Sequence, residues 1–320
     1  MVLKIRRLGT LCLLLVLWGC SESLPGFDAP SPGTYEHILN TRLLGFRRSY
    51  LIHIPAGYDG RKALPLVVAL HGGFGTARKM EEESGLSALA DREGFMVLYP
   101  NGMTLFGRLQ HWNAGHCCGI AMHRDVDDVG FLSRCIDQVR SRLPVDTSRI
   151  YMVGYSNGGM LAYLFAAKRP ETLAAFAVIA ASIGSRPSPS EPEKMVPPPA
   201  AAVPLIAFHG REDDLVPYAG GTRTKEGYLY VSVNRSTAFW VKANHGTRTP
   251  ARERMMNGKV AKDVWNSGDA RREVILYSLE GWNHHLPTRR FTHSLPEADP
   301  LRDFDAAEII CAFFKAHHRY

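Results

Sequence analysis

The segment 149–160 carries the residues best suited to nucleophilic chemistry, because it combines a serine with closely spaced glycines. Ser156 forms a Gly-x-Ser-x-Gly pentapeptide with Gly154 and Gly158, between a short apolar run and a segment of helical periodicity. A serine on such a strand-to-helix turn holds strained backbone angles, which small neighbours permit. The helix N-terminus would stabilise a developing oxyanion. We predict that Ser156 is a nucleophile; the alternative is a small residue in a tight turn.

The carboxylate that such a serine requires is expected after the next buried strand. A serine hydroxyl is a weak nucleophile at neutral pH unless a histidine base and an orienting acid act on it. On a strand–turn–helix serine site these groups follow in the order serine, acid, histidine. Asp213 and Asp214 come just after the apolar run 204–208, where a carboxylate can reach over the sheet edge. Position alone leaves these two aspartates as alternatives.

The histidine base is selected by its place in the chain. Six histidines follow Asp213, so order alone does not identify the base. His284 and His285 lie in the loop that leaves the apolar run 274–278, where a mobile imidazole is expected. His245 lies at a helix end, and His317 and His318 lie in the C-terminal helix or tail, so these three are interpreted as surface residues. We favour His284, with His285 as the alternative.

The glycine-rich segment 70–75 predicts the second part of an oxyanion hole. Such a hole uses the N–H of the residue after the nucleophile and an N–H from an early strand-to-helix loop. We therefore expect the N–H groups of Asn157 and Gly73 to bind the oxyanion, with that of Phe74 in reserve. His71 precedes the serine in the chain and is interpreted as structural.

The pattern of apolar residues predicts a single α/β domain over 34–320. Short apolar runs alternate with segments of helical periodicity, which is typical of a mostly parallel sheet with helices on both faces. The predicted strands are 49–54, 66–70, 95–98, 150–153, 175–180, 205–208 and 274–278. The predicted helices are 79–92, 129–143, 158–168, 233–244 and 304–317. The Pro-rich segment 186–203 predicts a surface loop or a cover over the carboxyl edge of the sheet, and its action as a lid stays open.

The N-terminal residues indicate export. A basic start followed by a short apolar run, too short to span a bilayer, predicts a signal peptide over 1–20. Its end resembles a bacterial lipobox, so we predict acylation of Cys20 and anchoring at the cell envelope; the alternative is plain secretion. The segment 21–33 is then a flexible tether. The net charge of +7 comes from scattered residues, which argues against a nucleic-acid partner.

The remaining polar residues predict no metal or cofactor. Cys117, Cys118, Cys135 and Cys311 allow three disulfide pairings, and the sequence does not choose among them. No Cys-x-x-Cys pair is present, and the spacing of His111 and His116 fits no common metal site. Asp127 and Asp128 precede a predicted helix, so we interpret them as helix-capping residues rather than a metal site or an acid pair.

Together these motifs resemble the secreted esterases grouped with polyhydroxybutyrate depolymerases and with feruloyl and acetylxylan esterases of carbohydrate esterase family one. The resemblance covers nearly the whole mature chain and rests on the segments 70–73, 112–119, 126–131, 154–160 and 209–218. It implies the α/β-hydrolase fold and ester hydrolysis through an acyl-enzyme, without a cofactor. It also implies that the acid is Asp213, four residues after the histidine that ends the preceding strand. The implied substrates are hydroxyalkanoate oligomers or feruloyl and acetyl esters of plant polysaccharide.

One motif departs from that family. The last family motif usually reads Gly-Gly-Gly-His-x-Trp-Pro, whereas the segment 281–287 reads Gly-Trp-Asn-His-His-Leu-Pro. The histidine stays in register, and Trp282 is expected to alter the wall of the acyl pocket. We further expect Phe74 to contact substrate, and Trp112 either to line the cleft or to fill the core. Two other functions stay open: a non-catalytic envelope lipoprotein that binds through this scaffold, and a serine peptidase.

Overall fold

The computed structural model describes residues 31–43, 46–104, 109–222, 227–266 and 268–319. The predicted signal peptide 1–20, Cys20 and most of the predicted tether 21–33 lie outside these residues. Among the described residues, no helix combines the length and the apolar character that crossing a bilayer requires.

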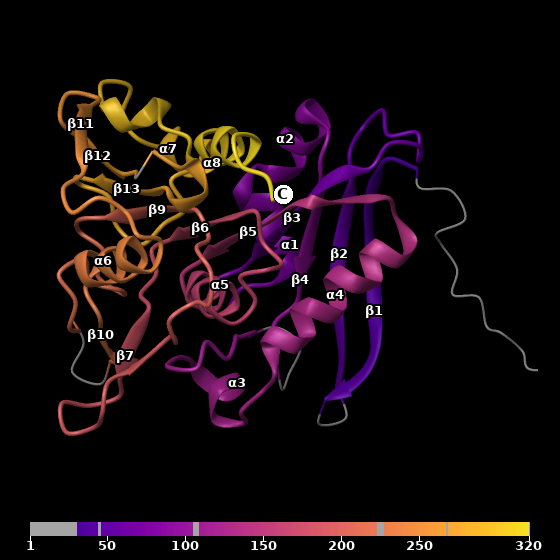
Figure 1. The fold of residues 1–320 in the computed structure, drawn as a ribbon, viewed down its shortest axis with the longest axis horizontal. Helices are drawn as coiled ribbons and strands as arrows, with labels where there is room; N and C mark the ends of the chain where they lie inside the picture. The colour runs from indigo at the N-terminus through magenta and orange to yellow at the C-terminus, as the bar shows by residue number, and fades with distance from the viewer. Residues whose placement is uncertain (1–30, 44–45, 105–108, 223–226, 267, 320) are drawn as a thin grey trace, which may run out of the picture.

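A ten-stranded sheet runs through the molecule in the order β1-β2-β4-β3-β5-β6-β9-β13-β12-β11 (Figure 1). The strands are β1 (Gly33–Leu43), β2 (Phe46–Ile54), β3 (Leu64–Leu70), β4 (Met96–Pro100), β5 (Val145–Tyr155), β6 (Ala175–Ile179), β9 (Leu205–Gly210), β11 (Ala251–Met255), β12 (Val260–Trp265) and β13 (Val274–Leu279). The six strands from β4 to β13 pair in parallel, and both flanks pair antiparallel. This is the α/β-hydrolase fold.

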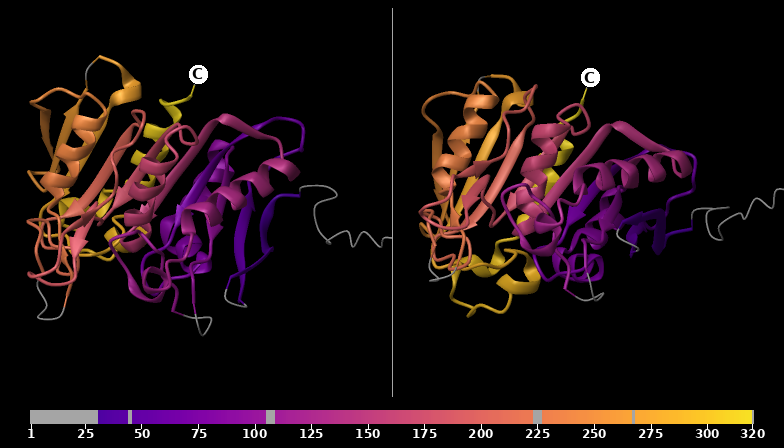
Figure 2. Two further views of the ribbon diagram at one scale, coloured as in Figure 1. Left: turned by 60° about the horizontal axis from the view of Figure 1, so that its bottom comes forward. Right: turned by 90° about the horizontal axis from the view of Figure 1, so that it is seen from below.

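Helices cover both faces of the sheet (Figure 2). One face packs against α4 (Asp128–Arg142), α5 (Asn157–Lys168) and α6 (Val233–Ala243), and the other against α1 (Ala77–Ser84), α2 (Leu86–Glu93) and α8 (Ala306–Lys315). Every residue of β4, β6, β9 and β13 is buried, as expected for strands covered on both sides. This double cover explains why these strands read as continuous apolar runs in the sequence.

The short elements lie mainly near the carboxyl edge of the sheet. They are α3 (Gly119–His123), α7 (Arg289–Thr292) and two 3-10 helices, η1 (Ala270–Arg272) and η2 (Pro300–Asp303). A second sheet has the order β10-β7-β8, with β7 (Gly184–Arg186), β8 (Lys194–Met195) and β10 (Leu229–Tyr230). The Pro-rich segment 186–203 is therefore not wholly irregular, because β7 and β8 pair with each other and supply local backbone hydrogen bonds.

Two further predictions about secondary structure need correction. The predicted helix 79–92 is two helices, because Gly85 adopts a left-handed conformation with φ 72° and separates α1 from α2. The antiparallel strands β1, β11 and β12 were not predicted. Many of their residues are exposed or only partly buried, so they lack the continuous apolar signal of the central strands. Asp127 caps α4 as predicted, since its side chain accepts from the N–H of Gly130.

Candidate active site

Ser156 occupies a strained turn between β5 and α5. Its φ of 53° and ψ of −122° lie outside the regions that most residues adopt, and its N–H donates to the carbonyl of Ile179 at 2.8 Å. A Cβ at Gly154 would lie 2.3 Å from the Gly158 oxygen, and a Cβ at Gly158 would lie 2.4 Å from the His71 oxygen. The two glycines are therefore required by close backbone contacts, and the turn holds the serine at the carboxyl edge of the sheet.

The structure brings Ser156, His284 and Asp213 into one hydrogen-bonded chain. His284 Nε2 lies 2.8 Å from Ser156 Oγ, and His284 Nδ1 lies 2.8 Å from Asp213 Oδ2. Because a carboxylate can only accept, the proton of the neutral imidazole is on Nδ1, and Nε2 is free to accept from the serine hydroxyl. The three residues follow β5, β9 and β13, whose carboxyl ends share one sheet edge.

Asp213 is fully buried, and its carboxylate has four close donors. Oδ1 accepts from the N–H groups of Leu215 and Val216 at 3.0 and 2.8 Å. Oδ2 faces His284 and also lies 3.2 Å from His209 Nε2, whose N–H is shared with the Val216 carbonyl at 2.8 Å. Burial acts to raise the pKa of Asp213, but the hydrogen bonds from His209 and His284 outweigh it and hold the pKa well below its ordinary value. The carboxylate therefore stays ionised and can stabilise an imidazolium.

The neighbouring candidates have other contacts. Asp214 is exposed, and its backbone N–H donates to Asn283 Oδ1 at 3.1 Å. The His285 ring stacks on Phe291 with 5.8 Å between ring centroids. The geometry thus brings Asp213 and His284, rather than the residues that follow them, to the serine.

Two backbone N–H groups close to Ser156 are free to bind an oxyanion. Among the described residues, no acceptor takes the N–H of Gly73 or of Asn157, and a Cβ on Gly73 would lie 3.8 Å from the Asn157 Cβ. The N–H of Phe74, the reserve candidate, already donates to the Gln110 carbonyl at 2.8 Å. The Phe74 ring is 65% exposed and packs edge-on against His111, so it is accessible to a substrate.

Trp112 takes the second of the two placements expected for it, because its side chain is fully buried in the core. It instead connects the two halves of the oxyanion hole. Its indole N–H donates to the His71 carbonyl at 2.9 Å, its backbone N–H donates to Asn157 Oδ1 at 2.7 Å, and its carbonyl accepts from Asn157 Nδ2 at 3.1 Å. Trp112 is therefore a positioning residue in the core.

Trp282 is likewise mostly buried, with 6% of its surface exposed. Its indole N–H donates to the His285 carbonyl at 2.9 Å, which braces the loop that carries His284. The structure thus places Trp282 as a support of the histidine loop, and its contact with the acyl group of a substrate stays a prediction. His71 is also structural: its Nδ1 donates to the Gly72 carbonyl and its Nε2 accepts from the Gly102 N–H. Burial lowers the pKa of His71 to about 4, so the ring stays neutral.

A buried ion pair that the sequence reasoning missed supports the segment around Trp112. Asp128 accepts from Arg48 Nη2 at 2.8 Å and from the Asn113 N–H at 2.7 Å, so it is not the second capping residue that we expected. The Arg48 guanidinium also lies over the Phe131 ring, 3.7 Å from its centroid. The sequence did hold a hint that Arg48 is buried. Alternate residues of a strand share one face, so Arg48 lies on the same face of β2 as the buried Tyr50 and Ile52.

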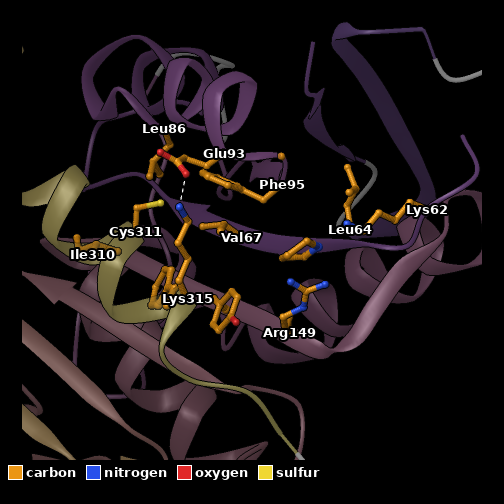
Figure 3. Close-up of a pocket in the computed structure, with 14 residues that line it drawn as sticks. Lys62, Leu64, Val67, Leu86, Glu93, Phe95, Arg149, Ile310, Cys311 and Lys315 are labelled. Carbon is orange, nitrogen blue, oxygen red and sulfur yellow. Dashed lines mark hydrogen bonds and ion pairs between the residues drawn. The ribbon is translucent and has the colours of Figure 1, made fainter. Parts of the chain in front are cut away.

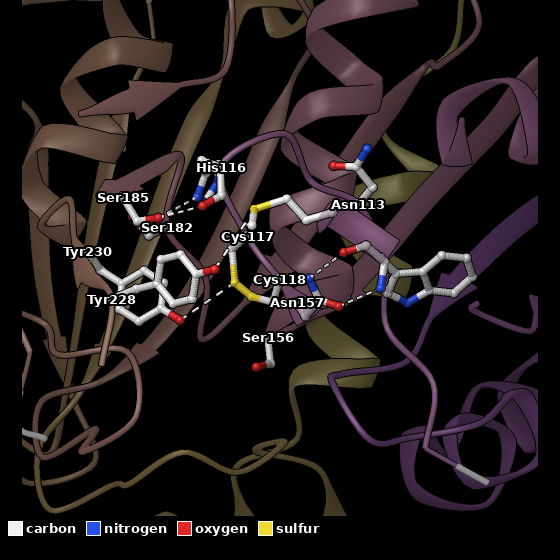
Figure 4. Close-up of a disulfide and its surroundings, with 12 residues drawn as sticks. Asn113, His116, Cys117, Cys118, Ser156, Asn157, Ser182, Ser185, Tyr228 and Tyr230 are labelled. Carbon is white, nitrogen blue, oxygen red and sulfur yellow. Dashed lines mark hydrogen bonds between the residues drawn. A yellow bond between two sulfur atoms is a disulfide. The ribbon is translucent and has the colours of Figure 1, made fainter. Parts of the chain in front are cut away.

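The disulfide pairing that the sequence left open is resolved by the structure. Cys117 and Cys118 form a disulfide, and Cys135 and Cys311 are free and buried. The disulfide lies in the same segment as Trp112, on one side of the catalytic turn (Figure 4). Its surroundings include Tyr228 and Tyr230, two residues that the sequence analysis did not single out.

Two cavities differ in their relation to this site. A cavity of about 230 Å³ lies beside the oxyanion loop and is lined in part by Gly73, Tyr155, His285, Leu286 and Phe291. A second cavity, of about 170 Å³, lies near the start of β3 and β5, at the amino edge of the sheet (Figure 3). Its lining includes Val67, Phe95 and Phe314. Of these two cavities, only the first is lined by the oxyanion loop and by Tyr155 and His285, the sequence neighbours of Ser156 and His284.

Comparison with known proteins agrees with the geometry. Residues 48–186 match the family model of esterase PHB depolymerases, and residues 127–256 match that of phospholipases and carboxylesterases. Over 207 residues the chain is 30% identical to feruloyl esterase B from Piromyces equi, covering 63% of this chain and 37% of that protein. Over 132 residues it is 32% identical to poly(3-hydroxyalkanoate) depolymerase C from Paucimonas lemoignei, covering 40% and 30%. The chain thus spans less than half the length of these curated relatives.

Among solved structures, the CE1 ferulic acid esterase from Anaeromyces mucronatus superposes with a TM-score of 0.53. The superposition covers 82% of this chain and 87% of that one, with 13% sequence identity. At this identity the likeness supports the fold alone.

Proposed function

Since the chain belongs to the α/β-hydrolase esterases of the polyhydroxybutyrate depolymerase type, we propose that it is a serine esterase that hydrolyses carboxylic esters through an acyl-enzyme. The observation that carries this proposal is the continuous hydrogen-bonded chain from Ser156 through His284 to Asp213, beside two free N–H groups. A binding scaffold would have no need to hold a strained serine, an imidazole and a buried carboxylate in this order.

The first half of the reaction forms the acyl-enzyme. Ser156 Oγ attacks the ester carbonyl carbon while His284 Nε2 takes the hydroxyl proton. The negative charge on the carbonyl oxygen is stabilised by the N–H groups of Gly73 and Asn157 and by the N-terminal end of α5. His284, held at Nδ1 by Asp213, then donates its proton to the departing alcohol.

The second half returns the enzyme to its starting state. Water takes the place of the alcohol, and His284 Nε2 accepts a proton as the water oxygen attacks the acyl carbon. Collapse of the second tetrahedral intermediate releases the acid, and the proton returns to Ser156 Oγ. Asp213 stays ionised throughout, because its donors stabilise the charged form.

The proposed substrates are small or oligomeric esters. Two relatives are named as a feruloyl esterase and a poly(3-hydroxyalkanoate) depolymerase, and others as acetylxylan esterases, which suggests feruloyl or acetyl esters of plant polysaccharide, or hydroxyalkanoate oligomers. The cavity of about 230 Å³ beside Gly73 has room for only part of such a molecule. A panel of nitrophenyl esters, methyl ferulate and hydroxybutyrate oligomers would separate these classes.

We further propose that the enzyme acts outside the cytoplasm, either secreted or anchored through acylated Cys20. The support is the basic and apolar pattern of residues 1–20 and the lipobox-like sequence that ends in Cys20. Mass spectrometry of the mature N-terminus tests this proposal. A diacylated or triacylated Cys20 supports anchoring, whereas an unmodified terminus argues against it.

Substitution of the serine tests the proposed reaction. Ser156→Ala should lower kcat/KM for nitrophenyl acetate by about 10³-fold or more, with unchanged circular dichroism, because nucleophile and base act as a unit. Ser133→Ala, which removes a hydroxyl on α4 that donates to the Val129 carbonyl, is the matched control. Near wild-type hydrolysis by Ser156→Ala would contradict the mechanism.

A further inference from the structure

A surface of sulfur and phenol groups lies beside the catalytic turn. We call it the sulfur–phenol wall and define it as the Cys117–Cys118 disulfide together with Tyr228 and Tyr230 (Figure 4). Cys117 is buried, whereas Cys118 and both tyrosines are only partly buried. The wall therefore has surface that a bound molecule can contact.

Hydrogen bonds fix this wall close to the nucleophile. The Trp112 carbonyl oxygen accepts from the Cys118 N–H at 3.3 Å and from Asn157 Nδ2 at 3.1 Å. Because both bonds end at one oxygen atom, Cys118 lies next to the residue that follows Ser156. Figure 4 shows the disulfide between Tyr230 and the Ser156–Asn157 turn. The wall therefore borders the turn that carries the nucleophile.

The wall is also held from the opposite side. Ser185 on β7 donates to the His116 carbonyl at 2.8 Å, and Tyr230 pairs with Ser185 across β10 and β7. The Ala114 N–H donates to the Cys117 carbonyl at 2.7 Å. These contacts connect the small sheet to the segment that carries the disulfide, so the wall is a preformed surface rather than a free loop.

The two phenol groups have weak partners. Tyr230 Oη lies 3.7 Å from Cys117 Sγ, and Tyr228 Oη donates to Met122 Sδ at 3.9 Å. Sulfur is a poor acceptor, and within the described part of the chain neither hydroxyl has an oxygen or nitrogen partner. Burial raises the pKa of Tyr230 to about 12, so its hydroxyl keeps its proton. Both groups are therefore available as donors to oxygen atoms of a ligand.

We propose that the sulfur–phenol wall binds the planar aromatic ring of an acyl group whose carbonyl lies at Ser156. This inference rests on the proposed esterase function and names its preferred substrate class as aromatic acyl esters over aliphatic hydroxyacyl esters. The tyrosine rings lie 6.2 Å apart between centroids and are tilted by 31°, and the disulfide continues their apolar surface. Ring-to-ring and sulfur-to-ring contacts favour an aromatic group, and the hydroxyls can donate to its oxygen substituents.

The competing subsite is the cavity beside the oxyanion loop. It is lined by Tyr155, Leu286 and Phe291 among others. Tyr155 already donates its hydroxyl to the His284 carbonyl at 2.9 Å, and the Phe291 ring is stacked on His285. The polar and aromatic groups there are thus engaged with the protein, unlike the phenols of the wall.

The preference for one acyl group over another can be measured with two methyl esters. Both release methanol, so they differ only in the acyl group. We would measure kcat/KM for methyl ferulate and methyl 3-hydroxybutyrate with the full chain and with Tyr228→Ala, Tyr230→Ala and Tyr230→Phe. The alanine variants should lower the ferulate to hydroxybutyrate ratio by about tenfold each, and Tyr230→Phe by about threefold through loss of the donor. Tyr35→Ala on the distant strand β1 should leave the ratio unchanged and serves as the matched control.

Binding of the product gives a readout that is independent of turnover. In the Ser156→Ala background, calorimetry should show ferulate binding that weakens about tenfold on Tyr230→Ala, with thermal unfolding monitored for each variant. An unchanged ester ratio and unchanged ferulate binding in the tyrosine variants would overturn the inference. So would loss of the aromatic preference in Phe291→Ala alone. If the wild type hydrolyses neither methyl ester, the proposed function fails, and ferulate binding still decides the role of the wall.

Discussion

Both edges of the central sheet carry cavities, but the polar groups at the two edges differ in whether they already have hydrogen-bond or ion-pair partners. At the amino edge most of the charged residues that line the cavity, all but Lys62, already have partners (Figure 3). Lys315 is paired with Glu93, and Arg149 Nε donates to Asp146 Oδ2 at 2.6 Å. At the carboxyl edge Ser156 has a φ of 53°, and the N–H groups of Gly73 and Asn157 have no acceptor among the described residues.

This contrast indicates what marks a site in this molecule. A hollow lined by apolar residues and paired charges is what imperfect packing at the end of a sheet produces. Backbone strain and unused donors cost free energy, so they persist only where the surrounding structure enforces them. We therefore expect chemistry to be confined to the strained edge.

The largest effect is expected for the imidazole. His284→Ala removes the base that accepts the serine proton, and should lower kcat/KM for nitrophenyl acetate by about 10³-fold or more. His285→Ala removes the neighbouring ring, which stacks on Phe291, and should change kcat/KM by less than about tenfold. Steady-state kinetics on both variants measure the difference. Equal losses of kcat/KM in the two variants would contradict the assignment of His284 as the base.

The adjacent aspartates give a second matched pair. Asp213→Asn replaces a fully buried carboxylate that orients His284, and should lower kcat by about 10²-fold to 10⁴-fold. Asp214→Asn alters an exposed side chain and should leave kcat within about twofold. A larger loss in Asp214→Asn than in Asp213→Asn would contradict the geometry described above.

The same two edges show what sequence could predict. The central strands and the turn at Ser156 were predictable, because double-sided burial and the glycine spacing leave direct signals. The sequence left two placements open for Trp112 and favoured the acyl pocket for Trp282, because an aromatic residue near a motif gives the same pattern whether it faces substrate or core. The choice between burial and exposure depends on contacts with residues far away in the chain, such as that between Trp112 and His71.

The role of Tyr230 could not be predicted for a similar reason. It reaches the site only because β10 pairs with β7, a pairing between two very short strands that leaves almost no periodic signal. Asp128 was taken for a capping residue because capping is local, whereas its contact with Arg48 joins positions 80 residues apart.

A smaller effect is expected in the dependence of stability on pH. The pKa of Asp213 in the folded chain lies below its ordinary value, so its stabilisation is complete above the unfolded pKa and is lost as the pH falls through the folded pKa. The advantage of the wild type over Asp213→Asn, on the order of 2 kcal/mol, should be constant above about pH 5 and shrink below about pH 4. Urea unfolding followed by circular dichroism between pH 7 and pH 3 measures it. If the difference in unfolding free energy between the wild type and Asp213→Asn grew as the pH fell, it would contradict the lowered pKa of Asp213.

The smallest effect is expected at the amino edge. Lys315→Ala breaks the pair with Glu93 on the rim of that cavity. Because the lysine side chain is 55% exposed, its loss should lower the unfolding midpoint by no more than a few degrees and leave kcat/KM within about twofold. Differential scanning calorimetry and esterase assays test both statements. A tenfold loss of activity would show that the amino edge contributes to function after all.

The most direct test of the central claim is covalent labelling by a fluorophosphonate probe, followed by mass mapping of the modified peptide. An activated serine reacts with this probe, whereas an ordinary surface serine does not. We predict labelling of the wild type at Ser156 alone, labelling reduced by about 10²-fold or more in His284→Ala, and none in Ser156→Ala. A wild-type chain that stays unlabelled, or one labelled at a different serine, would contradict the account.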